Sequence, residues 1–182
     1  MSRKLPTYLE PEEFKKLLAN TKRTDHKIAF LLGFGSGMRL SEIVGLEDKI
    51  QPVTKECFNF EKKTITIKGG KGGVDRIVPI PKGFKDSMLS YLPVNKKYKT
   101  VASARRSLQR IFMINTRKAN LLEKKPGLHF HSLRHSFGSR LANQGMPIHH
   151  IRTLMGHTNI STTNIYLIAN PTKALEDYEK YF

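Results

Sequence analysis

Several residue types and patterns are scarce in this 182-residue chain, and each scarcity excludes a class of protein. The single cysteine, Cys57, excludes an intramolecular disulfide and a zinc site built on paired cysteines. No apolar run is long enough for a secretory signal or a membrane span, so we expect no membrane partner. Glycine and proline occur at ordinary levels and 38% of the residues are apolar, which indicates one compact domain with a packed core.

Acidic residues are scarce as well, because 15 Asp and Glu stand against 32 Lys and Arg and leave a formal charge of +17. A chain with this excess should bind a polyanion, and DNA and RNA both fit. Binding should weaken as salt rises, since each neutralised phosphate releases condensed counterions. A single cysteine is typical of a reducing compartment, so we expect a cytoplasmic, nucleoid-associated protein.

Hydrophobic periodicity predicts a mainly α-helical fold with one small antiparallel β-sheet. Between Cys57 and Pro79 the pattern alternates instead, which indicates short strands at 64–67 and 74–78 joined by a glycine-rich turn at 69–73. The apolar residues at helical spacing are Phe14, Leu17 and Leu18; Ile28, Leu31 and Leu32; Leu108, Ile111 and Phe112; Leu133, Phe137 and Leu141; and Ile148, Ile151 and Leu154.

An ordered set of potential cations precedes one tyrosine along the chain, with no acidic metal cluster among them. A phenol can act as a nucleophile, but its pKa of about 10 keeps it protonated at neutral pH unless cations or a base assist. Guanidinium groups would favour the phenolate and would match the oxygens of a phosphate. The set therefore indicates a phosphodiester substrate, and its members are Arg39, Lys71, His131, Arg134, His157 and Tyr166.

Taken singly, most of these residues have a simpler explanation. Arg39 could cap the C-terminal end of the preceding helix, and Lys71 could be a solvated hairpin tip. His157 could bond the carbonyls of a helix end, and Tyr166 could be a core phenol with a bonded hydroxyl. Only the joint order of the residues favours catalysis over these alternatives.

Metal and nucleotide sites are weaker interpretations of the same residues. His129, His131 and His135 could bind zinc, but Ser132 stands where an H-E-x-x-H motif needs glutamate. The glycine run around Lys71 lacks the Ser or Thr that a phosphate-binding P-loop requires after its lysine. We therefore expect neither a metal nor a nucleotide cofactor.

Five motifs in order resemble the catalytic domain of the tyrosine recombinases, the phage-type integrase family with Xer-like members. The resemblance spans roughly Leu5 to the C-terminus. The motifs are Gly37-Met38-Arg39-Leu40-Ser41-Glu42, Gly70-Lys71-Gly72 with Arg76-Ile77-Val78-Pro79, His131-Ser132-Leu133-Arg134-His135-Ser136, Leu154-Met155-Gly156-His157, and Thr162-Thr163-Asn164-Ile165-Tyr166.

The resemblance implies site-specific DNA recombination through a covalent protein–DNA intermediate. Tyr166 would attack the scissile phosphate, form a 3′-phosphotyrosyl link and expel a 5′-hydroxyl. Arg39 and Arg134 would hold the non-bridging oxygens, and preorganised donors of this kind can each supply about 3 to 4 kcal/mol. Because the link keeps the energy of the phosphodiester, the resemblance implies no cofactor, metal or nucleotide hydrolysis.

The resemblance also implies roles for the remaining polar residues. Lys71 would protonate the leaving oxygen, and His157 would add a hydrogen bond to the phosphate. His131 would accept or shuttle the proton of Tyr166, as suits a side chain that titrates near neutrality. Glu42 occupies the usual acidic position of the family, where we expect it to support the site.

A second group of basic residues is expected to contact the DNA backbone. Arg105, Arg106 and Arg110 recur along one predicted helix, together with Arg117 and Lys118, and a solvated helix face explains them nearly as well. Arg76 belongs to the motif that follows Lys71, and we expect it to contact DNA too. Such contacts position a protein on a duplex without specifying a sequence.

The expected organisation is a linker remnant or N-terminal arm at 1–8, a catalytic domain at 9–170 and a helical tail at 171–182. The tail could pack on a neighbouring protomer or on its own domain. The resemblance implies double-stranded DNA and self-association on DNA as a tetrameric synapse. Complete family members usually carry an N-terminal DNA-binding domain, so without one we expect weaker and less selective DNA binding.

Two other functions remain open at this point. A type IB topoisomerase would share the phosphotyrosine chemistry and would relax supercoils without synapsis. A non-catalytic DNA-binding module would use the basic surface alone, but it does not explain why the six catalytic candidates occur together.

Overall fold

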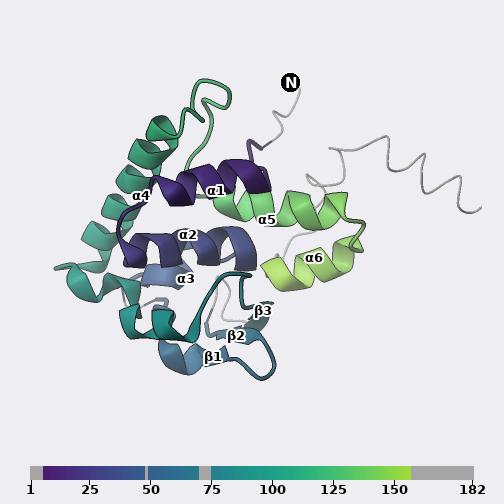
Figure 1. The fold of residues 1–182 in the computed structure, drawn as a ribbon. Helices are drawn as coiled ribbons and strands as arrows, with labels where there is room; N and C mark the ends of the chain where they lie inside the picture. Colours follow the sequence, from purple (N-terminus) through teal and green to yellow (C-terminus); the bar gives the residue numbers. More distant parts are fainter. Residues whose placement is uncertain (1–5, 48, 70–74, 157–182) are drawn as a thin grey trace, which may run out of the picture.

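The computed structural model describes residues 6–47, 49–69 and 75–156. These residues form a mainly helical domain with a three-stranded antiparallel sheet, which confirms the predicted fold class (Figure 1). All the predicted helices within the described residues are present. The helices are α1 (Pro11–Ala19), α2 (Thr24–Ser36), α3 (Leu40–Val44), α4 (Val101–Lys118), α5 (Ser132–Asn143) and α6 (Ile148–Met155); the strands are β1 (Phe58–Asn59), β2 (Thr64–Ile67) and β3 (Arg76–Pro79); and 3-10 turns lie at Lys55–Cys57, Asp86–Tyr91 and Val94–Lys97.

Helix α2 is the central element of the fold. It is apolar on nearly every side, and residues 28–34 are all buried, as expected for a helix surrounded by other elements. It packs against α5, α3 and α4, and Figure 1 shows α1 on one side of it and the sheet on the other. Helices α2 and α5 approach closely at Gly33. A Cβ at this position would lie only 3.1 Å from the Cβ of Leu133 in α5.

The C-terminal end of α2 determines where the following residues point. The helix passes through Gly33 and Gly35 and ends at Gly37, which adopts the left-handed conformation with φ +65° and donates its N–H to Leu32 O. A Cβ at Gly37 would lie 2.5 Å from Cδ1 of Phe137, so both the backbone and the space favour glycine. The chain turns here, and Arg39 becomes the residue that precedes α3.

The sheet order is β1-β2-β3, and its alternation decides which side chains face the core. Ile65 pairs with Val78 and Ile67 pairs with Arg76. Along β3, Arg76 and Val78 are buried while Ile77 between them is 58% exposed, as the period of two requires. The predicted turn between β2 and β3 lies largely outside the described residues, as does the tail at 171–182.

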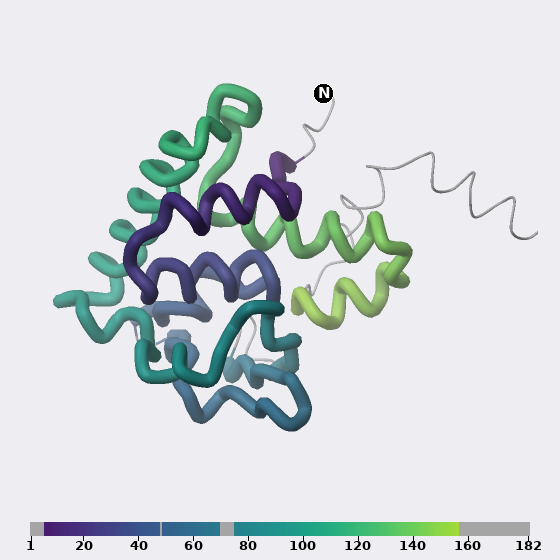
Figure 2. Tube along the Cα trace, viewed as in Figure 1, coloured from purple at the N-terminus to yellow at the C-terminus, as the bar shows by residue number. Residues whose placement is uncertain are grey.

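Distant parts of the chain meet around α5. The backbone N–H of Leu9 donates to Ser136 Oγ at 2.8 Å, and Figure 2 shows the N-terminal stretch running onto this helix. On its other side α5 packs against α6. Phe137, Ile151 and Met155 form a small apolar cluster there, separate from the main core. No helix among the described residues has the length and apolar character needed to cross a membrane.

The aromatic centre of the main core offers a test of this packing. Phe112 is fully buried and makes edge-on contacts with the rings of Phe30 and Phe130, at centroid distances of 5.7 and 6.1 Å. We expect Phe112→Ala to lower the free energy of unfolding by about 3–5 kcal/mol, because a cavity replaces the ring. Urea denaturation followed by circular dichroism measures this. Phe60→Ala is the matched control. Phe60 is 38% exposed, so its change should lower the free energy of unfolding by about 1 kcal/mol or less. Equal losses of unfolding free energy in the two variants would contradict the packing.

Candidate active site

Three of the six catalytic candidates lie within the described residues, and the structure brings them to one region. Arg39 precedes α3, His131 is the N-cap residue of α5, and Arg134 is the third residue of α5. Lys71, His157 and Tyr166 lie outside the described residues, so their roles stay predictions.

A buried carboxylate binds two of the basic residues together. Glu42 in α3 is only 1% exposed, and both of its oxygens accept a hydrogen bond from Arg76, each at 2.7 Å. The backbone N–H of Arg39 donates to the same carboxylate at 2.7 Å, and its Nη1 donates at 3.0 Å. The single carboxylate of Glu42 thus holds two guanidinium groups in place, as the predicted supporting role requires.

The environment of Glu42 keeps it charged. Burial raises the pKa of its carboxyl group, but the hydrogen bonds and positive charge of Arg76, joined by Arg39, outweigh burial and lower the pKa to about 2. Glu42 is therefore ionised at any physiological pH.

Arg134 is buried between the C-terminal ends of two helices. It is 2% exposed; its Nη1 donates at 2.6 Å to the carbonyl of Gly37, which ends α2, and its Nη2 donates to the carbonyl of Met155, the last residue of α6. Helix C-termini carry unsatisfied carbonyls and a partial negative charge, so they stabilise a buried cation. The fold thereby fixes this guanidinium through backbone groups.

His131 is poised as a neutral base. Burial of its ring, with the charges of Arg134, His129 and Arg39, lowers the pKa of its imidazole to about 4. The residue also has solvent-exposed surface, so water screens part of this shift. Its place at the N-terminal end of α5 acts in the same direction, since that end of a helix disfavours a cation. The imidazole is neutral at pH 7 and can accept a proton.

The three histidines that suggested zinc lie near one another. The ring centroids of His131 and His135 are 4.9 Å apart, and that of His129 is 6.4 Å from each. Nδ1 of His129 already lies 3.0 Å from the Gly127 carbonyl. In residues 6–47, 49–69 and 75–156 no group of three or more potential ligands is arranged to hold a metal ion.

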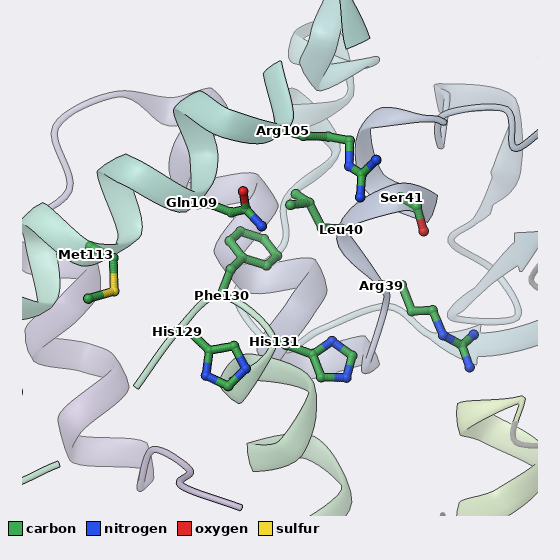
Figure 3. A pocket seen from close by; sticks show the side chains of 9 residues that line it. All are labelled: Arg39, Leu40, Ser41, Arg105, Gln109, Met113, His129, Phe130 and His131. Carbon is green, nitrogen blue, oxygen red and sulfur yellow. The ribbon is translucent and has the colours of Figure 1, made fainter. Parts of the chain in front are cut away.

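A cavity of about 360 Å³ opens beside Arg39 and His131. Figure 3 shows Arg105 reaching from α4 toward the segment of Leu40 and Ser41, with the rings of His129 and His131 on the opposite side of the cavity. Arg105 Nε is buried and has no hydrogen-bond partner among the described residues. It is the one buried side-chain nitrogen or oxygen in this part of the chain without a partner. A buried donor of this kind costs free energy until an acceptor reaches it.

The expected DNA-contacting residues occupy different environments. Arg106 and Arg110 are exposed on α4 outside the cavity, where they can reach a polyanion. Arg76 is 8% exposed, and its Nε donates to the carbonyl of Leu154 at 3.0 Å while its other two nitrogens bond Glu42. All three guanidinium nitrogens of Arg76 thus bond protein groups, and its contact with DNA stays a prediction.

Sequence patterns contained part of this information. The alternation along β3 places Arg76 on the same face as buried Val78, which indicates an inward guanidinium that needs an acid. Helix α3 is too short for a periodic signal, so the helical position of Glu42 was missed. Gln109 and Met113 line the cavity, yet no motif marked them, and His129 was considered only as a possible zinc ligand.

The pKa of Glu42 generates a test of this arrangement. A pKa lowered from 4.5 to about 2 stabilises the fold above pH 4.5, and this contribution disappears as the pH falls toward 2. At about 1.4 kcal/mol per pKa unit, it amounts to roughly 3 kcal/mol at pH 7. We expect Glu42→Gln to lower the free energy of unfolding by about that amount at pH 7, and the difference from the parent chain to shrink between pH 5 and pH 2. Urea unfolding at a series of pH values measures both. Glu12→Gln is the control, because the Glu12–Lys15 pair is exposed. If the loss of unfolding free energy in Glu42→Gln did not vary with pH, the arrangement would be refuted.

Comparisons with known proteins show which family the chain resembles. The profile of the phage integrase family matches residues 7–173. Tyrosine recombinase XerA of Thermococcus kodakarensis is 36% identical over 176 residues, which cover 90% of this chain and 58% of that protein. The solved structure of XerH site-specific recombinase, bound to difH substrate in a pre-cleavage complex, matches with a TM-score of 0.72 and 23% identity over 97% of this chain and 54% of that chain. The catalytic domain of bacteriophage HP1 integrase matches with a TM-score of 0.61 and 25% identity over 97% of this chain and 95% of that chain.

This chain spans less than two thirds of the length of the XerA and XerH proteins. The family match covers nearly all of the described residues and includes Arg39, Glu42, His131 and Arg134. The chain therefore belongs to the phage integrase family.

Proposed function

We propose that this chain cuts and rejoins duplex DNA in site-specific recombination, through a covalent link between Tyr166 and a 3′-phosphate. The observation that carries the proposal is the arrangement of Arg39 and Arg134 next to a neutral His131. Arg39, Arg76 and Arg134 carry three positive charges against the single negative charge of Glu42, so these four residues have a net charge of +2. An excess of fixed positive charge suits a phosphate whose negative charge becomes concentrated in the transition state.

The chemistry requires only groups of the chain and the DNA. The Tyr166 oxygen attacks phosphorus and His131 takes its proton, which a neutral imidazole allows. The bond from phosphorus to the 5′ oxygen breaks, and Lys71 supplies the proton that this oxygen needs. Arg39 and Arg134 bind the non-bridging oxygens, and His157 adds a further hydrogen bond. Attack by another 5′-hydroxyl reverses these steps and joins a new strand.

The family match and the relatives support the proposal. XerA is named a tyrosine recombinase, and the XerH structure is that of a site-specific recombinase bound to difH substrate in a pre-cleavage complex. By analogy we propose double-stranded DNA as the partner and a tetrameric synapse as the working assembly. We also propose that residues 9–170 form the catalytic domain, preceded by an arm at 1–8 and followed by a helical tail at 171–182.

A nicked suicide duplex tests the nucleophile. Cleavage beside a nick releases a short strand that diffuses away, so the phosphotyrosyl link accumulates and shows on a denaturing gel. Tyr166→Phe should abolish the adduct and leave the DNA dissociation constant within about twofold, because it removes only the attacking oxygen. Each of the tyrosines Tyr91, Tyr98 and Tyr178 provides a control, since its change to Phe should preserve the adduct. An adduct that persists in Tyr166→Phe would refute this nucleophile, and supercoil relaxation without recombinant junctions would favour topoisomerase activity.

Arg105 gives a separate test of DNA contact. Its unpartnered Nε lies beside the cavity that Arg39 and His131 line, so a DNA phosphate is the acceptor that we propose for it. Arg105→Gln should weaken binding of duplexes of any sequence and should reduce the slope of log affinity against log salt by about 1. Fluorescence anisotropy over a range of salt concentrations measures the slope. Lys15→Gln on α1 removes the same charge from an exposed pair and should change the slope less; equal effects would show that Arg105 acts only through net charge.

A further inference from the structure

Three guanidiniums from three different elements bind the same helix end. Arg76 Nε in β3 donates to the carbonyl of Leu154 at 3.0 Å, Arg134 Nη2 in α5 donates to that of Met155, and Arg39 Nη2 donates to that of Gly156 at 3.2 Å. The three acceptors are consecutive residues at the C-terminus of α6. Each arginine therefore takes part of its position from one short stretch of backbone.

The chemistry of a helix terminus explains why these carbonyls are available. The last carbonyls of an α-helix have no partner within the helix and carry the negative end of its dipole. Gly156 ends α6 in the left-handed conformation, and its N–H returns to the carbonyls of Arg152 and Thr153. This turn leaves the next three carbonyls to the arginines.

The residue that makes this turn has no room for a side chain. Gly156 has φ +59°, and a Cβ there would lie 2.9 Å from Cδ of Arg76 and 3.3 Å from its Nε. Any side chain must therefore displace Arg76. Because Arg76 binds both oxygens of Glu42, and Glu42 binds Arg39, the displacement would pass to the phosphate-binding arginine.

We propose that Gly156 is a positioning residue for Arg39 and Arg134, acting through the α6 carbonyls and through the Arg76–Glu42 pair. This inference rests on the proposed function, since it concerns the groups that would hold the scissile phosphate. It assigns the glycine a role besides ending a helix. In the sequence Gly156 directly precedes His157, which begins the segment that leads to Tyr166.

The decisive variant is Gly156→Ala in the full chain. We expect the single-turnover rate of adduct formation on the nicked duplex to fall by about tenfold to a hundredfold, as small displacements of catalytic groups do. The DNA dissociation constant should stay within about twofold, because most of the basic surface is unchanged. Gly83→Ala is the matched control: Gly83 also has a positive φ, of 88°, but no atom lies within 4 Å of a Cβ placed there. An unchanged rate in folded Gly156→Ala, or an equal loss in Gly83→Ala, would overturn the proposal.

Gly156→Asn separates crowding from backbone strain. Asparagine tolerates the left-handed conformation better than alanine, so it would restore the rate if strain alone were responsible. The proposal predicts no restoration, because Asn carries the same Cβ against Arg76. Recovery of the parental rate would overturn it.

A measurement without DNA keeps the inference distinct from the proposed function. The Nε proton of Arg76 is buried and hydrogen-bonded, so it should exchange slowly with water in the parent chain, as seen by nitrogen-15 NMR of the arginine side chains. Gly156→Ala should speed this exchange and shift the Nε signals of Arg39 and Arg134, whereas Gly83→Ala should change neither. Absence of any adduct with the parent chain would refute the proposed function alone. Unchanged arginine signals in folded Gly156→Ala would refute the positioning role alone.

Discussion

The ion pair between Glu42 and Arg76 is the interaction on which the rest of the site depends. Guanidiniums collected at one place repel each other, and burial makes that repulsion stronger because less water screens it. A carboxylate that accepts from both Arg76 and Arg39 reduces the repulsion and fixes the direction of both side chains. Removing either charge would leave the other buried without a partner, which costs about 3–5 kcal/mol.

Helix ends supply what the carboxylate does not. The C-terminal ends of α2 and α6 point their carbonyls at Arg134, while the N-terminal end of α5 lies at His131. The helix dipoles thus favour a cation at Arg134 and a neutral ring at His131. The way that α2, α5 and α6 pack therefore influences the charge state of both side chains.

Much of this could be predicted from the sequence, for reasons that differ between elements. Long helices such as α4 and α5 repeat apolar residues over several turns, and the strands near Ile65 and Val78 alternate, so their periods are visible. The order of Arg39, His131 and Arg134 along the chain predicted a common site, because order is joint information that no single residue carries, and the structure brings the three residues to one region. The contacts of Arg76 with Glu42 and with the C-terminal end of α6 were not predicted, since a positive charge in a strand and a glycine after a helix each have common explanations. Only the fold shows that Arg76 lies against Gly156, 80 residues away in the sequence, and leaves no space there for a Cβ.

The charge of the site also bears on the choice between catalysis and simple DNA binding. A binding module gains from exposed cations such as Arg106 and Arg110, which keep their hydration until DNA arrives. Burying Arg134 and fixing Arg39 costs solvation and confers little extra affinity for a duplex, because one phosphate is neutralised as well by a mobile surface lysine. Fixed donors become useful when charge grows on an oxygen during a reaction, since they need no reorganisation at that moment. One carboxylate and two helix ends hold these guanidiniums in fixed positions. This arrangement therefore argues for a site that stabilises a transition state.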